Sequence, residues 1–315
     1  MRLFCLLFVL PLTPLFSFAQ TPPYAAIDAH ADSLREDNFS KLDQLTARLI
    51  EPARNDTERV RAIFYWLARN IKYDYEGLYK KNWQPYDLNT DLAAATFTWK
   101  KGICSGFAVL MKKMLDLAGI ENALVTGNAK GESFLYEDRR SNHIWNSVRL
   151  GGQWQLLDVT WATTQWSKKS VSDLFFLPPP AQFALTHYPD QAQWLLYDNP
   201  MSYESYQSLP EIGYTYYFLE FGPEPPRFER DSAAVTFYLK IPKSVAVGVI
   251  LRNVDTYEEN ILHDIRPEPA GQVSALRVPL PAEGRFEVEL TGISDKTPYR
   301  KYFAVLTAPY PTLRP

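Results

Sequence analysis

Cysteine is scarce in this chain of 315 residues, which contains only Cys5 and Cys104. Two cysteines cannot supply a zinc site that needs three or four thiolates, and they can form one disulfide at most. An excess of one charge is also lacking, because 33 Lys and Arg stand against 36 Asp and Glu and give a formal net charge of −3. No basic excess therefore draws the chain to nucleic acid or to an anionic membrane by charge alone.

Apolar runs long enough to span a membrane are lacking too, although the first nineteen residues are strongly apolar. Arg2 precedes a short apolar stretch that Pro11 and Pro14 interrupt, and small residues stand near its end. A spanning helix needs about 20 apolar residues, so this pattern indicates a secretory signal peptide over residues 1–19, with cleavage after Ala19. We therefore expect an exported protein, secreted or periplasmic, that is not stably inserted in a membrane.

Export changes the meaning of the cysteine count. Removal of the signal peptide removes Cys5, which leaves Cys104 as the one thiol and makes an internal disulfide impossible. An unpaired thiol in an oxidising compartment is a liability unless it is buried or used. A free cysteine is more often buried for structural reasons than used in chemistry. The residues around Cys104 therefore have to distinguish a buried structural thiol from a functional one.

Apolar periodicity indicates a mixed helix and strand region in the first two thirds of the chain. Three segments repeat apolar side chains at helical spacing, namely 40–50, 56–71 and 104–118. Ser40 stands where it can cap the first of these helices, Asn55 or Asp56 can cap the second, and Gly119 stands where the third should end. Three later segments alternate with a period of two, which predicts strands over 122–129, 143–150 and 153–161. Residues 72–100 show only weak periodicity, which indicates loops with short helices. Residues 164–207 indicate irregular structure.

From about residue 208 the chain shows no helical periodicity, and short runs typical of strands are separated by Pro, Gly, Asp and Asn. These runs are 235–239, 245–251, 275–280, 285–290 and 302–306. Their spacing favours a β-sandwich. We therefore predict an α+β protein with an N-terminal helical extension over 20–44, a mixed domain over 45–207 and a β-sandwich over 208–315.

Cys104 lies between Gly102 and Gly106, in the first turn of the helix expected over 104–118. Backbone N–H groups are unpaired there and the helix dipole favours an anion, so the position favours a thiolate. The flanking glycines would let other backbone approach the sulfur closely. A thiolate nucleophile also needs an adjacent base that a third group orients.

A histidine and an aspartate are placed to serve as that base and its partner. His143 begins an expected strand, and the Gly151–Gly152 pair that follows the strand is a hairpin-turn signal. With a two-residue turn, Trp145 faces Asp158, and Asp158 becomes the diagonal neighbour of His143 on the same face, about 7–8 Å away between backbones. The turn therefore predicts a His–Asp pair from local register alone.

Other interpretations fit parts of this pattern. His143 alone fits a buried strand histidine, and Asp158 alone fits the cap of a turn. Gly-x-Cys-x-Gly also matches the nucleophile elbow of α/β-hydrolases, whose triad runs in the order nucleophile, acid, base. Here the order is Cys104, His143, Asp158 and no strand-rich segment precedes the cysteine, so the elbow is the weaker interpretation.

The segments that carry these residues resemble the transglutaminase-like superfamily, and within it the kyphoscoliosis-peptidase branch. Four segments match in the family's order, namely 102–108, 117–120, 143–146 and 154–161. Residues 70–74 and the stretch 175–196, which contains His187, also resemble that branch. The resemblance implies a papain-like core in which a helix-borne cysteine packs on an antiparallel sheet, followed by an Ig-like β-sandwich. It implies a triad of Cys104, His143 and Asp158, and a structural role for His187.

The function implied by this resemblance is that of an exported cysteine hydrolase or acyltransferase. It would act on protein or peptide amide bonds through a thioester on Cys104, with a protease or amidase favoured. No metal, organic cofactor or nucleic-acid partner is indicated, and the second oxyanion donor stays open among Tyr73, Trp83 and Trp99. The alternative is a catalytically silent scaffold whose β-sandwich binds a partner, such as a protein or a glycan.

Overall fold

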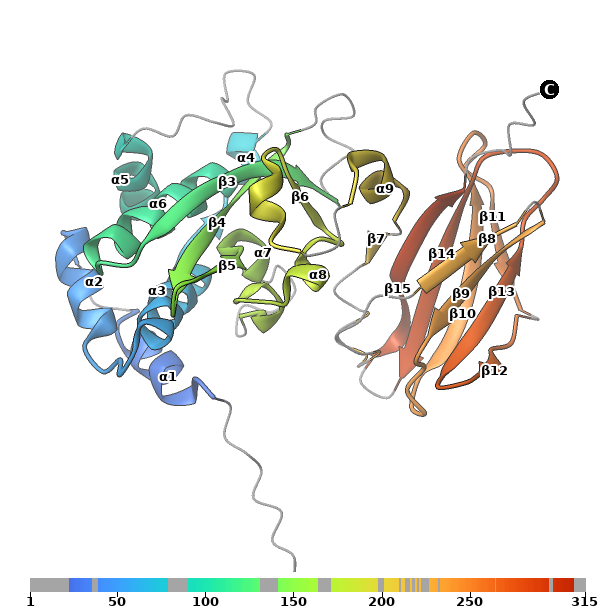
Figure 1. Cartoon of the computed structure of the whole chain (residues 1–315), viewed down its shortest axis with the longest axis horizontal. Coiled ribbons are helices and arrows are strands. Elements are labelled where there is room, and N and C mark those ends of the chain that lie inside the picture. Colours follow the sequence, from blue (N-terminus) through green and yellow to red (C-terminus); the bar gives the residue numbers. More distant parts are fainter. Residues whose placement is uncertain are drawn as a thin grey trace, which may run out of the picture.

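The structure is a computed structural model of the whole chain (Figure 1). It describes residues 23–35, 39–78, 90–130, 141–163, 171–197, 201–209, 211–212, 216, 219, 221, 227–231, 233–263, 265–294 and 297–308. The expected signal peptide lies outside these residues, as does Trp83. Within the described ranges, no helix combines the length and the apolar character that a membrane crossing requires.

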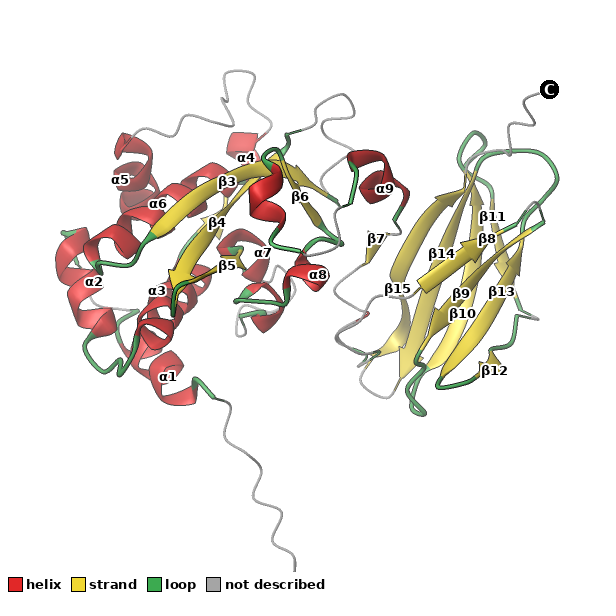
Figure 2. Cartoon of the chain, viewed as in Figure 1, coloured by secondary structure: helices red, strands yellow, loops and turns green. Residues whose placement is uncertain are grey.

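The first part of the chain combines helices with a four-stranded antiparallel sheet (Figure 2). Its helices are α1 (Ala25–Ser33), α2 (Leu42–Ile50), α3 (Asp56–Asn70), α4 (Tyr75–Leu78), α5 (Thr90–Trp99), α6 (Cys104–Leu117), α7 (Val159–Ala162), α8 (Pro180–Phe183) and α9 (Tyr203–Ser208), with 3-10 turns η2 (Asp173–Phe175) and η3 (Ala192–Leu195). Its strands are β1 (Lys72–Tyr73), β2 (Lys101–Gly102), β3 (Asn122–Ala129), β4 (His143–Leu150), β5 (Gln153–Leu157) and β6 (His187–Pro189). The sheet has the order β5-β4-β3-β6, and α6 packs on β3 and β4.

The three helices expected from periodicity are confirmed as α2, α3 and α6, each within two residues of its expected bounds. Of the two caps predicted for α3, Asn55 is the one that forms: its side chain accepts a hydrogen bond from the backbone N–H of Glu58, and Asp56 is the first residue of the helix. The cap predicted for α2 is wrong, since the residue before that helix is Lys41 and no side chain caps it. Gly119 ends α6 with a φ of 72°, a conformation that favours glycine.

The hairpin register is confirmed up to the end of β5 and wrong beyond it. Leu150 pairs with Gln153 as predicted, and the pairing continues to Asn146 with Leu157. The strand does not extend to residue 161, because Asp158 caps α7 there by accepting hydrogen bonds from the backbone N–H groups of the next turn. Asp158 therefore stands at a strand-to-helix junction and not within a strand.

Strand β6 was not predicted, since its three residues are too few to show a period. It pairs antiparallel with the end of β3 through Gly127, Asn128 and Ala129. The close approach depends on Gly127, where a Cβ would lie 2.2 Å from the Tyr188 carbonyl oxygen and 2.6 Å from the Trp145 ring. This absence of a side chain lets β6 lie against the sheet and brings His187 into the core.

The second part of the chain consists of two antiparallel sheets of order β11-β10-β14-β15-β7 and β12-β13-β9-β8. The strands are β7 (Glu211–Ile212), β8 (Arg227–Arg230), β9 (Ala234–Leu239), β10 (Ala246–Asn253), β11 (Glu259–Leu262), β12 (Glu268–Ala270), β13 (Val273–Pro279), β14 (Phe286–Ser294) and β15 (Thr297–Ala308). Each of the five predicted runs coincides with a strand, and β7, β8, β11 and β12 were not singled out. One apolar cluster joins β9 and β13 of one sheet to β10 and β14 of the other.

Candidate active site

Cys104 is the first residue of α6, and its side chain is 2% exposed. It packs with Ala108 on the next turn of α6 and with Ile144 of β4. A hydrogen bond of 3.0 Å from the Asn146 side-chain amide to the Ala108 carbonyl ties α6 to β4. These contacts place the thiol at the start of a helix, beside the strand that His143 begins.

The glycines that flank Cys104 serve a different contact from the one expected. A Cβ at Gly106 would lie 2.6 Å from the Thr96 hydroxyl, and one at Gly102 would lie 3.0 Å from the Thr96 methyl group. The glycines therefore accommodate a buried side chain of α5, whereas we had expected approaching backbone. Backbone does pair with the segment before the cysteine, since Asp74 donates its N–H to the Gly102 carbonyl over 2.9 Å.

His143 is fully buried at the first position of β4, and its neighbour Asn142 fixes that position. The Asn142 side chain accepts a hydrogen bond from the Ala129 N–H at 2.7 Å and donates one to the Ala129 carbonyl at 3.1 Å. It thus pairs with β3 as a backbone unit would, and extends the ladder past the last paired residue, Gly127. The sequence does not single out Asn142, because its role depends on the contact of its side chain with Ala129 on a neighbouring strand.

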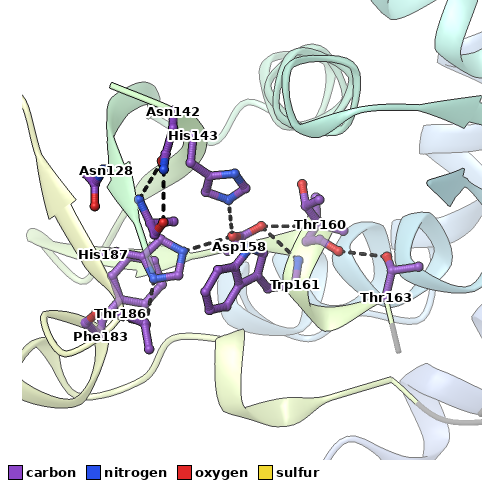
Figure 3. A network of polar contacts seen from close by, with 12 residues as sticks. Asn128, Asn142, His143, Asp158, Thr160, Trp161, Thr163, Phe183, Thr186 and His187 are labelled. Carbon is purple, nitrogen blue, oxygen red and sulfur yellow. Dashed lines mark hydrogen bonds and ion pairs between the residues drawn. The ribbon is translucent and has the colours of Figure 1, made fainter. Parts of the chain in front are cut away.

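Asp158 receives hydrogen bonds at both carboxylate oxygens (Figure 3). Its Oδ2 lies 2.6 Å from the Nε2 atom of His143. Its Oδ1 accepts hydrogen bonds from the backbone N–H groups of Thr160 and Trp161, at 2.7 and 3.1 Å. The structure therefore brings the predicted His–Asp pair into direct contact, and Asp158 caps a helix as well.

His187 also lies against Asp158, which the sequence did not reveal. Its Nε2 atom is 3.1 Å from the same Oδ2 that meets His143, and its Nδ1 atom is 2.8 Å from the Thr186 hydroxyl (Figure 3). The contact depends on the pairing of β6 with β3, which no local pattern predicts. The resemblance of residues 175–196 to the kyphoscoliosis-peptidase branch is the signal in the sequence that points to His187, and it implies only a structural role.

The electrostatics of the three groups are coupled. Burial acts against a charged His143, but the charge and hydrogen bond of Asp158, together with the Cys104 side chain, outweigh it and hold the pKa of His143 well above its usual range. Burial also acts against a charged Asp158, yet the charge of His143 and the hydrogen bonds from both imidazoles keep the pKa of Asp158 well below its usual range. Burial, together with the charge of His143, lowers the pKa of His187 to about 4, against the opposing hydrogen bond and charge of Asp158.

This arrangement can support acyl transfer. Because Nε2 of His143 faces Asp158, Nδ1 is the ring nitrogen that can serve the thiol, and the Cys104 side chain interacts with this imidazole. An ionised Asp158 beside His143 stabilises an imidazolium, and an imidazolium stabilises a thiolate. The geometry thus brings together a thiol, an imidazole and a carboxylate, the groups that acyl transfer by a cysteine requires.

The same groups fit a metal ion less well. Single ligand atoms of His143, Asp158 and His187 all lie within 4.8 Å of one another. However, zinc bonds of about 2.0–2.1 Å in tetrahedral geometry set two ligand atoms about 3.3 Å apart. The separations of 2.6 and 3.1 Å from Asp158 Oδ2 are instead hydrogen-bond distances, so the contacts are those of a hydrogen-bonded network.

Comparison with known proteins defines the class. Residues 43–159 match the family model described as the transglutaminase-like superfamily, so this segment of the chain is similar to that superfamily. The matched range contains Cys104, His143 and Asp158, and it ends before His187.

Particular relatives resemble a longer part of the chain. Kyphoscoliosis peptidase of Mus musculus is 34% identical over 180 residues, and that of Homo sapiens is 35% identical over 180 residues. Each alignment covers 54% of this chain and 26% of the relative. Hillarin of Drosophila melanogaster is 24% identical over 303 residues, covering 84% of this chain and 36% of Hillarin. The chain thus spans about a quarter to a third of the length of these relatives.

The low pKa of His187 predicts a specific loss of stability in mild acid. Between pH 6.5 and about 4 the unfolded chain takes up a proton at this histidine that the folded protein excludes, so stability is present above pH 6.5 and falls as the pH falls. The slope is at most about 1.4 kcal/mol per pH unit for one proton. His143 adds no slope in this window, because it is protonated in both states there; its contribution is lost as the pH rises above 6.5.

Urea unfolding at several pH values measures this slope in the wild type and in His187→Gln. We expect the variant to lose less stability between pH 6.5 and 4 than the wild type does. His263→Gln, at an exposed histidine, is the matched control and should retain the wild-type slope. Equal slopes in the wild type and His187→Gln would contradict the assignment of the excluded proton to His187.

Proposed function

We propose that this protein is a transglutaminase-like cysteine hydrolase or acyltransferase that acts on amide bonds of proteins or peptides, and that hydrolysis is its main reaction. The observation that carries the proposal is the buried contact of 2.6 Å between His143 and Asp158, beside the thiol that begins α6. The peptidase name of the relatives from mouse and human supports a protein or peptide substrate.

In the proposed mechanism the Cys104 sulfur attacks the carbonyl carbon of the substrate, forming a C–S bond and an oxyanion. The C–N bond then breaks while the His143 imidazolium gives its proton to the leaving amine, which leaves a thioester. Water attacks the thioester with His143 as the base, releasing a carboxylic acid and the thiol; a second amine would release a new amide instead. Asp158 orients His143 and stabilises its positive charge through both steps.

The oxyanion needs hydrogen-bond donors, since removing one typically lowers the rate by about 100- to 1000-fold. The backbone N–H of Cys104 at the start of α6 is the first donor of the proposal. Tyr73 is favoured for the second, because β1 pairs it with Gly102, two residues before the cysteine. The Trp99 side chain is 69% exposed, which makes it the weaker candidate of these two.

The alternative proposal is a silent scaffold. The specific observation in its favour is burial, because Cys104 and His143 are both almost inaccessible. Under this proposal the last part of the chain engages the partner. We infer that residues 208–315 form a β-sandwich, Ig-like in architecture, since one apolar cluster is shared by two antiparallel sheets.

Thiol alkylation as a function of pH separates the two proposals. An ordinary thiol with a midpoint near pH 8.5 reacts roughly 300-fold more slowly with iodoacetamide at pH 6 than at its plateau. We expect the rate at Cys104 to fall by less than about 10-fold, because the imidazolium of His143 stabilises the thiolate. The dependence on pH, and not the absolute rate, is the readout, since burial slows all labelling.

His143→Ala should restore the steep dependence of an ordinary thiol, whereas the exposed-histidine control His263→Gln should keep the shallow one. Peptide mapping assigns the labelled residue, and Cys104→Ser is the control that measures labelling at other residues. A steep dependence in the wild type that His143→Ala leaves unchanged would refute the enzyme and favour the scaffold.

We also propose that the protein is exported, either secreted or periplasmic, on the basis of the pattern of residues 1–19. Expression of the whole gene product in a secreting host should yield a protein whose first residue is Gln20, as N-terminal sequencing or intact mass would show. Replacement of Ala19 by Arg, which puts a large charged residue at the cleavage position, should retain the longer form. A wild-type product that keeps Arg2 would argue against the signal peptide.

A further inference from the structure

The Asp158 carboxylate accepts more hydrogen bonds than a simple His–Asp pair would supply. Two backbone N–H groups occupy Oδ1, and imidazole nitrogens of both His143 and His187 lie against Oδ2. A carboxylate offers about four lone-pair sites, so each site of Asp158 has a partner. The second imidazole is the unusual one, because the proposed mechanism does not use it.

The surroundings of His187 favour a neutral ring that donates a hydrogen bond. Burial lowers its pKa to about 4, so the ring is neutral at physiological pH and carries one N–H. The Thr186 hydroxyl lies 2.8 Å from Nδ1, closer than the 3.3 Å that separates it from the Phe183 carbonyl. When this hydroxyl donates to Nδ1, the single ring proton is on Nε2, where it points at Asp158.

The ring of His187 is also held in place. It stacks on Phe183 with a centroid separation of 4.0 Å and an interplanar angle of 19°. Trp145 contacts it edge-on at 5.0 Å, and Trp161 lies 4.6 Å away. The strand that bears it is anchored by the Tyr206 hydroxyl, which donates to the Thr186 carbonyl at 2.9 Å. A donor held this rigidly fixes the direction of the oxygen that it contacts.

We propose that His187 is a positioning residue, which donates a second imidazole N–H to Asp158 and so limits how tightly this carboxylate holds the proton of His143. The inference rests on the proposed function, in which His143 has to release that proton to a leaving amine. A carboxylate that shares its charge with a further donor attracts the neighbouring imidazolium less strongly. His187 would thus keep His143 a usable acid while Asp158 still orients it.

Few ionisable groups surround the pair in the part of the chain that the structure describes. Cys104 faces His143 from the start of α6, Asp158 from the cap of α7, and His187 from β6. The other rings around the two histidines are aromatic and uncharged, namely Trp145, Trp161, Phe175 and Phe183. A change in the titration of His143 can therefore be assigned to one of three neighbours.

The titration of His143 in a protein that carries Cys104→Ala tests the inference. Selective isotope labelling of histidine yields four imidazole signals, few enough to assign each one by substitution. With His187→Leu, which removes the donor, we expect the His143 midpoint to rise by about one pH unit, or about 10-fold in proton affinity, typical of one lost hydrogen bond to a charged group. With His187→Gln, whose amide can still donate to Asp158, the midpoint should stay within about 0.3 units of the parent.

An unchanged midpoint in His187→Leu would overturn the inference, and so would equal shifts in the Leu and Gln variants, since packing alone would explain them. If His187→Leu does not fold, the NMR signals of the ring nitrogens of His187 in the wild type test the inference instead. We expect His187 to carry its proton on Nε2 between pH 5 and 8, and a proton on Nδ1 would remove the donor and the inference with it. Because the titration is made without the thiol, its outcome is independent of whether Cys104 proves reactive.

Discussion

The buried carboxylate of Asp158 is the constraint on which the rest of the site depends. An ionised carboxylate in the interior is strongly unfavourable unless hydrogen bonds and an opposite charge offset its lost hydration. Asp158 obtains these from three directions, from the backbone of α7, from His143 and from His187. Its position therefore decides at once where β5 ends, where α7 begins and how two imidazoles are oriented.

Much of the surrounding fold brings those donors to one point. The hairpin of β4 and β5 delivers His143 from the start of β4 and Asp158 from the residue that follows β5, and the Asn142 side chain holds the start of β4 against β3. Gly127 lets β6 approach the opposite side of β3, and so it delivers His187. Helix α6 lies across β3 and β4 and places Cys104 beside the first residue of β4. The Cys104 thiol is thus positioned by the packing of α6 on this sheet.

Local signals in the sequence were sufficient to predict the helices and strands whose apolar residues recur at a regular spacing. The helix that bears Cys104 shows a long apolar stripe, and the turn at Gly151–Gly152 defines a register that brings Asp158 near His143. The prediction was wrong directly after Leu157, where Val, Thr and Trp continue a β-type pattern. An aspartate cap outweighed that propensity, because it pairs two backbone N–H groups that a strand edge would leave unpaired.

What the sequence could not supply were the contacts between distant segments. His187 reaches Asp158 only because a three-residue strand pairs with β3, and so short a strand has no period to detect. The fit of Thr96 against the glycines around Cys104 is likewise a matter of packing between two helices. Both features depend on tertiary structure, in which propensity is a weak guide.

The central claim is that Cys104, His143 and Asp158 form an acyl-transfer centre. The most direct measurement is mass spectrometry of the protein and a panel of protein substrates after incubation with a tagged amine and acid quenching. We expect a hydroxylamine-labile acyl adduct on Cys104, with cleaved, deamidated or amine-tagged substrate that disappears in Cys104→Ser and falls sharply in Asp158→Asn. The absence of any Cys104-dependent adduct or product across a broad panel would contradict it.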